Sequence, residues 1–189
     1  SMSQTTDQAA LRGGTIEIQG LDANWALVTQ TKTLDATLTT NVVTLGTPLI
    51  RVFRLKVLSS VVADSAIRIH NAGETQDYAI ILAGNNQTIM AIYTVPAGKT
   101  AYMVILYTTM NPATNQDPTS MAVKLWARDN AAGYAPQIKH VFGLISGDHH
   151  HEYKPYKKFT EKTDIYLTAT PTGKAADVSA GFDLILVDN

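Results

Sequence analysis

The sequence contains no cysteine among its 189 residues. A disulfide framework, a thiol nucleophile and cysteine-bound zinc are therefore all excluded. A chain of this length buries roughly 70% of the surface that its unfolded form exposes, so it needs neither a disulfide nor a metal to fold. The absence of cysteine is also typical of a reducing compartment, or of a particle assembled inside a cell.

The sequence has no excess of charge of either sign, because 15 basic and 16 acidic residues leave a formal net charge of −1. No global field draws such a chain to nucleic acid or to an anionic membrane, and we expect neither as a partner. The longest apolar stretch, around residues 103–106, is far shorter than the roughly 20 residues that cross a bilayer. No basic segment followed by an apolar one opens the chain, which predicts that a signal peptide is absent.

The motifs of several large enzyme classes are missing as well. The sequence has no Gly-x-Gly-x-x-Gly and no Gly-Lys-Ser/Thr at the spacing of a phosphate loop. It also has no Gly-x-Ser-x-Gly nucleophile elbow and no His-Glu-x-x-His zinc motif. Its carboxylates are scattered singly along the chain. We therefore expect a protein that is not an enzyme and that uses no cofactor.

Short strands dominate what is present. Segments in which apolar and polar residues alternate recur between turns rich in Gly, Pro, Asn and Asp, which predicts an all-β antiparallel sandwich of jelly-roll type with at most one short N-terminal helix. We expect an N-terminal arm over residues 1–14, where Ser1 and Met2 look like a cloning remnant and Thr6–Arg12 is the helix candidate. A single sandwich domain is expected over residues 15–189. The clearest alternating segments are 15–19, 53–57, 66–70, 123–127 and 165–169.

Three further strand segments are apolar on both faces: residues 78–82, 101–107 and 182–187. A sandwich strand needs only one buried face, so the second face must be covered by something else. A neighbouring subunit and a long loop of the same chain are equally good explanations. The first of them predicts a homo-oligomer.

Turn residues predict several hairpins. Pro96-Ala97-Gly98 suits a type I turn that joins strands at 88–94 and 100–107, and Ser146-Gly147-Asp148 resembles another hairpin connection. Two long loops or hairpins, Asn111–Ser120 and His149–Phe159, are candidate binding surfaces, since loops carry recognition on many sandwich scaffolds.

The histidine-rich run at residues 148–152 is the one cluster with metal-binding chemistry. On a strand, His149 and His151 share a face and could chelate a transition metal together. A cupin-like metal-dependent enzyme would need a Glu about four residues after this pair and a later third His, whereas Glu152 follows His151 directly and no later His exists. We therefore predict a solvent-exposed, His-rich hairpin with no metal site, and keep His149 and His151 as the alternative ligands.

The next stretch mixes cations with aromatic rings, a composition that can bind polyanions or stack on sugars. Lysines and a proline are equally typical of a protected edge strand, which is the interpretation we prefer. Trp126 faces away from the apolar stripe of its strand and is a further candidate. The candidate binding residues are Lys154, Tyr156, Lys157, Lys158 and Trp126.

Four phrases carry a resemblance to a known family. They are Tyr-Thr-Val-Pro-Ala-Gly-Lys-Thr at 93–100, Glu-Lys-Thr-Asp-Ile at 161–165, Asp-Val-Ser-Ala-Gly-Phe at 177–182 and Ile-Leu-Val-Asp-Asn at 185–189. In this combination the chain resembles a family of uncharacterised virion structural proteins of marine phages and large algal viruses, over most of its length from about Gly14. The resemblance assigns no site residue, because the family offers no catalytic motif to carry over.

The resemblance implies a non-enzymatic structural or accessory subunit of a virus or phage particle, such as a capsid decoration, tower or fibre-head protein. Such a subunit would be assembled in the host cytoplasm and reside in the virion. Its expected partners are copies of itself, with a trimer as the first guess, other virion proteins and a host surface glycan. The alternatives are a carbohydrate- or receptor-binding sandwich module and, as a weaker candidate, the cupin-like enzyme.

Overall fold

The computed structural model describes residues 2–4, 13–37, 42–112 and 120–189, and all regular structure in these ranges is β-strand. Every strand pairing is antiparallel, so the expected all-β class is confirmed. The helix candidate at 6–12 lies outside the described residues. No helix with the length and hydropathy of a membrane span occurs in the described ranges. The strands are β1 (Met2–Gln4), β2 (Thr15–Leu21), β3 (Leu27–Thr33), β4 (Arg51–Val57), β5 (Ile67–His70), β6 (Asp77–Ile81), β7 (Ile92–Thr94), β8 (Lys99–Pro112), β9 (Ser120–Asp129), β10 (Gln137–Leu144), β11 (Gly147–Phe159), β12 (Thr163–Thr172) and β13 (Ala176–Asp188).

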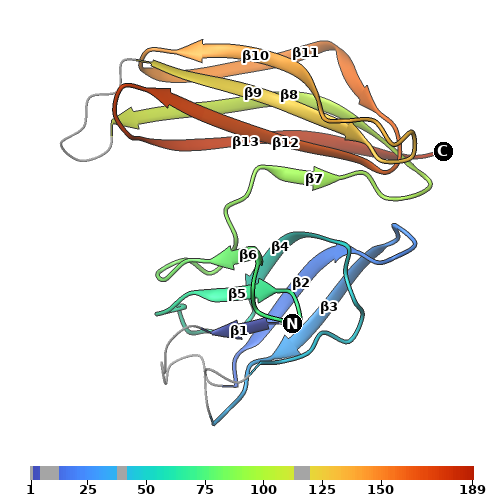
Figure 1. The fold of residues 1–189 in the computed structure, drawn as a ribbon, viewed down its shortest axis with the longest axis vertical. Helices are drawn as coiled ribbons and strands as arrows, with labels where there is room; N and C mark the ends of the chain where they lie inside the picture. The colour runs from blue at the N-terminus through green and yellow to red at the C-terminus, as the bar shows by residue number, and fades with distance from the viewer. Residues whose placement is uncertain (1, 5–12, 38–41, 113–119) are drawn as a thin grey trace. The chain divides into compact units, whose positions relative to one another are not determined.

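The chain forms two compact units, Ser1–Met90 and Ala91–Asn189 (Figure 1). This division differs from the single domain that we expected over residues 15–189. Its physical basis is that each unit has a hydrophobic core of its own. One core is built from side chains between Ile16 and Ile81, and the others from side chains between Val95 and Ile165.

The first unit consists of two three-stranded sheets, with strand orders β3-β2-β4 and β1-β5-β6. Alternation explains the packing of β2, because Ile16 and Ile18 are fully buried while Glu17 between them is partly exposed. Leu55 on β4 and Ile67 and Ile81 from the other sheet complete the centre of this core.

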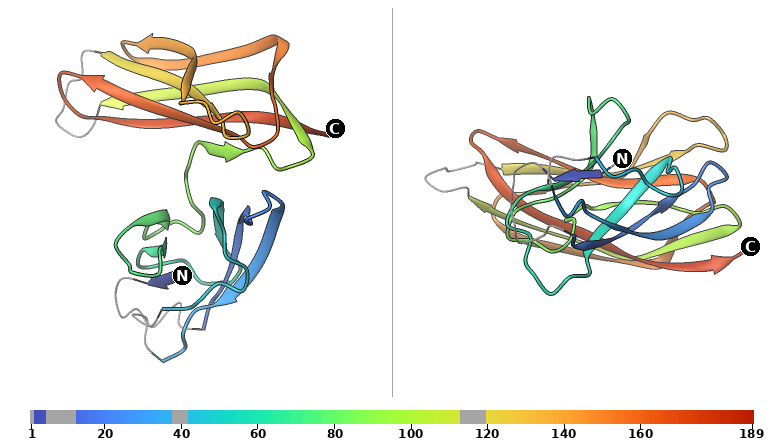
Figure 2. Two further views of the ribbon diagram at one scale, coloured as in Figure 1. Left: turned by 45° about the vertical axis from the view of Figure 1, so that its right-hand side comes forward. Right: turned by 90° about the horizontal axis from the view of Figure 1, so that it is seen from below.

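The second unit also has two layers: a four-stranded sheet, β10-β9-β12-β7, and a three-stranded sheet, β11-β8-β13 (Figure 2). Their inner faces share a core that includes Met103 and Leu106 from β8, Leu125 from β9 and Ile165 from β12. The expected sandwich character is therefore present in this unit, with side chains from facing sheets filling the space between the layers.

Three of the expected hairpins are wrong. The Pro96–Gly98 turn joins β7 to β8, but β7 pairs with β12 in the four-stranded sheet and β8 pairs with β11 and β13 in the other. The turn after Leu144 likewise joins β10 in one sheet to β11 in the other. Residues 149–159 are part of the single strand β11, whose pairing with β8 is interrupted between Glu152 and Lys157. In each case the backbone groups bond to a strand other than the neighbour along the chain.

Three of the four phrases that carry the resemblance meet at one end of the second unit, which we call the polar corner. The Thr94 hydroxyl donates to Asp164 Oδ1 at 2.6 Å, and the Gly98 amide donates to Glu161 Oε2 at 2.6 Å. The chain end joins them, because the Asn189 amide donates to the Gly98 carbonyl at 3.1 Å. The phrases at 93–100, 161–165 and 185–189 are therefore one packing arrangement.

We expect Gly20→Ala to destabilise the first unit. A Cβ at this position would collide with the carbonyl oxygen of Arg51 on the neighbouring strand, so backbone must shift. Overpacking of this kind costs about 1–3 kcal/mol of unfolding free energy. Urea denaturation followed by circular dichroism measures the loss. Gly73→Ala is the matched control, because its nearest neighbour would lie at an ordinary 3.9 Å. Equal stability of the two variants would contradict the expectation.

We expect Asp164→Ala to loosen the polar corner. Asp164 is almost fully buried and also accepts a hydrogen bond from Asn130 Nδ2 at 2.9 Å, so its loss removes an acceptor from the buried Thr94 hydroxyl and from Asn130. Stranding the buried Thr94 hydroxyl costs about 1–3 kcal/mol, whereas Asp177→Ala on the exposed part of β13 should cost less than about 0.5 kcal/mol. Thermal unfolding of both variants tests this, and a loss in Asp177→Ala as large as in Asp164→Ala would refute it.

Candidate functional site: a three-histidine cluster

His149 and His151 lie on β11 and are partly buried, facing the opposite layer of the second unit. His150 between them is exposed on the other face of the strand, opposite Tyr107 of β8. The expected exposed hairpin is therefore wrong for His149 and His151. The alternation of side chains along a strand explains why two of the three consecutive histidines point inward and one points outward.

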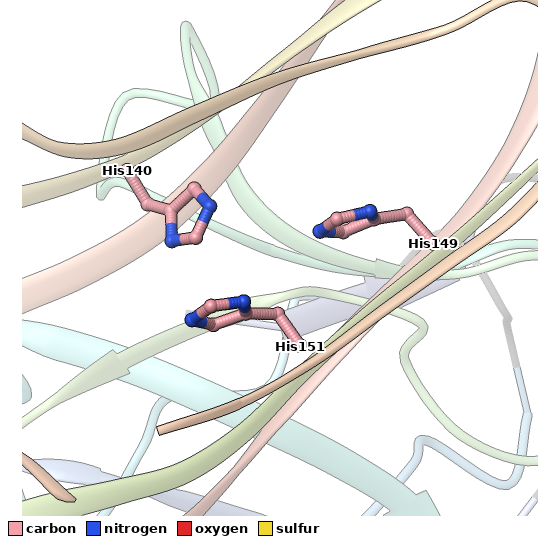
Figure 3. A group of neighbouring side chains, drawn as sticks. All are labelled: His140, His149 and His151. Carbon is pink, nitrogen blue, oxygen red and sulfur yellow. The ribbon is translucent and has the colours of Figure 1, made fainter. Parts of the chain in front are cut away.

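A third histidine completes the cluster. His140 lies on β10, in the facing sheet, and its ring centroid is 4.5 Å from that of His151 and 6.3 Å from that of His149. One ring nitrogen from each of the three residues lies within 4.8 Å of the others. Figure 3 shows the His140 ring approaching from one side and the two rings of β11 from the other.

The chain reaches this geometry by turning back across the sandwich. β10 ends at Leu144 and β11 begins at Gly147, and the two strands lie in facing sheets, a connection known as a β-arch. Counting from these ends, His140 is four residues before the turn and His151 four residues after it. Phe142 and His149 hold the corresponding positions two residues from the turn, and their rings stack at 4.0 Å.

Tyr153 supports the cluster from the next inward position of β11. Its hydroxyl lies 2.9 Å from His140 Nδ1. Burial raises the pKa of Tyr153 to about 12, so the phenol stays neutral at physiological pH. The phenol oxygen can therefore accept a hydrogen bond from Nδ1–H of His140 and fix that ring's orientation.

The surroundings of His140 and His149 favour the neutral form of these two rings. Burial lowers the pKa of His140, and the positive charges that His151, His149 and Lys157 would carry lower it further. Burial and the neighbouring His151 and His150 likewise lower the pKa of His149, against a smaller opposite effect of Asp148. Neutral rings keep a lone pair on one nitrogen each, which is the form that binds a metal.

Glu152 does not join the three rings. Its side chain is exposed and forms an ion pair with Lys154 at 2.7 Å, which lowers the pKa of Glu152 and raises that of Lys154. The cupin pattern requires its third histidine after His151, whereas the third ring here comes from upstream. The cluster therefore offers nitrogen ligands without the carboxylate of the cupin pattern.

The other candidate residues are dispersed. Trp126 lies on β9, where its ring stacks on Tyr166 and its Nε1 donates to Thr168 Oγ1 at 2.9 Å. Tyr156 is 51% exposed within the interruption of β11, and Lys157 lies 5.5 Å above the ring of Tyr153. The candidates thus occupy both sheets and form no single surface.

Lys158 differs from these because it lines a pocket of about 380 Å³ in the second unit. Lys139 and Tyr134 contribute further polar groups to the wall, and Phe159 contributes apolar surface. The wall also carries the carboxylate of Asp129, so the two cations exceed its acidic charge by one, and with the exposed phenol they can hold an anionic or sugar ligand.

His140 is the site residue that could not be identified from the sequence. It stands alone in its strand and carries no motif of its own. The signal that could have identified it is its distance from the turn, which equals that of His151 when the chain folds back at residues 145–146. Comparisons with protein-family models, curated proteins and solved structures found no match to this chain.

Proposed function

We propose that this chain is a non-enzymatic structural or accessory subunit of a virus or phage particle, which works by assembling with copies of itself and with other virion proteins. The jelly-roll type of sandwich and the trimeric order expected from sequence are parts of this proposal. The sequence resemblance supports it, and so does the physical role of the resembling phrases, which lock strands together at the polar corner.

The observation that carries the proposal is the outer face of the three-stranded sheet. Ile185 and Val187 on β13 are 45% and 46% exposed, and Tyr107 on β8 is 45% exposed. In the register of the sheet, Ile185 lies opposite Tyr102 and Tyr107 opposite Gly181. The absence of a side chain at Gly181 lets the Tyr107 ring lie across the sheet, because a Cβ there would meet the phenol.

Strand β13 adds an exposed edge to this face. It is 13 residues long and, among the described strands, pairs with β8 alone. A long edge strand with apolar side chains is a template for association unless something covers it. We propose that a neighbouring subunit, and not a long loop of the same chain, covers this strand. That neighbour is a second copy of the chain.

A second candidate function, carbohydrate or receptor binding, is favoured by the Lys158 pocket. A host surface glycan with anionic groups would meet Lys139 and Lys158 in the hollow and the exposed ring of Tyr134 at its wall. Such binding is compatible with a particle subunit, since the pocket lies between β9, β10 and β11 rather than on β13.

We expect the wild-type protein to be oligomeric at micromolar concentration and Ile185→Lys to dissociate it, because a charge would then be buried in an apolar contact. Sedimentation equilibrium measures the mass, and circular dichroism checks that the variant is folded. Val141→Lys is the matched control, since Val141 is a similarly exposed apolar residue on the other sheet. A monomeric wild type, or equal dissociation by both substitutions, would remove the proposed interface.

We expect Lys158→Glu to weaken binding of a sulfated polysaccharide such as heparin by several fold, because it reverses a charge inside the pocket. Lys154→Glu should have a smaller effect, since Lys154 lies outside the pocket and pairs with Glu152. Titrations at two salt concentrations show whether the binding is electrostatic. Equal effects of the two substitutions would indicate a diffuse surface charge instead of a site.

A further inference from the structure

We propose that His140, His149 and His151 bind one divalent transition-metal ion of the Zn²⁺ class, which joins β10 to β11 across the open edge of the second unit. The inference is independent of the proposed particle role. The inference depends on the meeting of three imidazole rings from two facing sheets. Apolar side chains would fill the space between these strands equally well, so packing does not by itself explain three histidines there.

The spacing of the rings suits such an ion. Zinc–nitrogen bonds of about 2.0–2.1 Å place tetrahedral ligand atoms roughly 3.4 Å apart. The three ligand nitrogens already lie within 4.8 Å of one another, so small rotations of the side chains would close the site. Stacking on Phe142 restricts the rotation of the His149 ring. The ring planes of His149 and His151 are 6° apart, so the two rings have nearly the same orientation.

A second observation points into the same space. The Nε2 atom of His149 is buried and has no hydrogen-bond partner among the described residues. Burying a polar atom without a partner costs free energy, and in native proteins such atoms commonly contact a bound ion or water molecule. A metal ion held by the three rings would give this nitrogen a ligand bond.

Tyr153 supplies the outer support that metal-binding histidines usually have. When Nδ1–H of His140 donates to the Tyr153 oxygen at 2.9 Å, Nε2 of His140 is left with its lone pair for the metal. Tyr153 is therefore a positioning residue, and the predicted ligands are the three histidines.

The donor set defines the class of ion. Neutral imidazoles suit Zn²⁺, Ni²⁺, Cu²⁺ and Co²⁺, whereas Ca²⁺ and Mg²⁺ require oxygen ligands. Three protein ligands leave a fourth position for water or for a group from another molecule. The turn at 145–146 already joins β10 to β11 at one end of these strands. The ion would add a second link between the two sheets, several residues away from that turn.

The test is isothermal titration of the tag-free full chain with ZnCl₂ after chelator treatment, alongside four single variants. We expect one Zn²⁺ per chain for the wild type, and at least a tenfold weaker affinity for His140→Ala, His149→Ala and His151→Ala. His150→Ala is the matched control, because it removes a histidine from the same run that points to the other face. It should bind like the wild type.

A second readout separates loss of the site from loss of the fold. Zn²⁺ at about 100-fold above the wild-type Kd should raise the melting temperature of the wild type and of His150→Ala by about 5–10 °C, and should raise that of His140→Ala by no more than about half as much. Circular dichroism of the metal-free variants shows whether they remain folded. Tyr153→Phe should bind about tenfold more weakly with unchanged stoichiometry.

Two outcomes would overturn the proposal. If His140→Ala binds Zn²⁺ as well as the wild type, the ion is held adventitiously by the run of three consecutive histidines. If His150→Ala weakens binding as much as His149→Ala does, the run binds as a flexible chelator and the inward-facing geometry is irrelevant. Should the His140→Ala chain be unfolded without metal, His140→Gln supplies the same comparison with a side chain of similar volume.

Discussion

The second unit depends on the way β8 uses both of its backbone edges. This strand of 14 residues pairs with β11 on one side and with β13 on the other. Its neighbour along the chain, β7, must therefore pair elsewhere, and it does so with β12 in the facing sheet. β11 is held in this sheet by β8, whereas β10 pairs with β9 in the facing sheet, so the turn between β10 and β11 crosses the sandwich. Connections between layers bring side chains from facing sheets together, and the histidine cluster is a direct result.

Local pattern was sufficient to predict most strands. Alternation in 15–19 and 123–127 identifies β2 and β9, because the period of a strand is fixed by its geometry. Pairing partners could not be predicted, since a turn such as Pro96–Gly98 has the same residues whether its strands pair or cross between layers. The division into two units was missed for a related reason: no run of linker residues marks the boundary at Met90 and Ala91.

The site shows the same limit. His149 and His151 could be identified from their spacing, because residues two apart on a strand share a face. The facing position of His140 depends on which sheet receives β11, which is a property of long-range pairing. Asp164 and Glu161 illustrate the opposite case: they belong to a phrase that the sequence alone singles out, and each accepts a short hydrogen bond from the phrase at 93–100.

The equal distances of His140 and His151 from their turn limit how this segment can change in length. Side chains alternate along a strand, so one residue gained or lost between Val141 and Leu144 would turn His140 to the outer surface. Such an event would separate the three rings while leaving every histidine in the sequence. In related chains, a gap in an alignment at this point would therefore say more about the cluster than the presence of the histidines themselves.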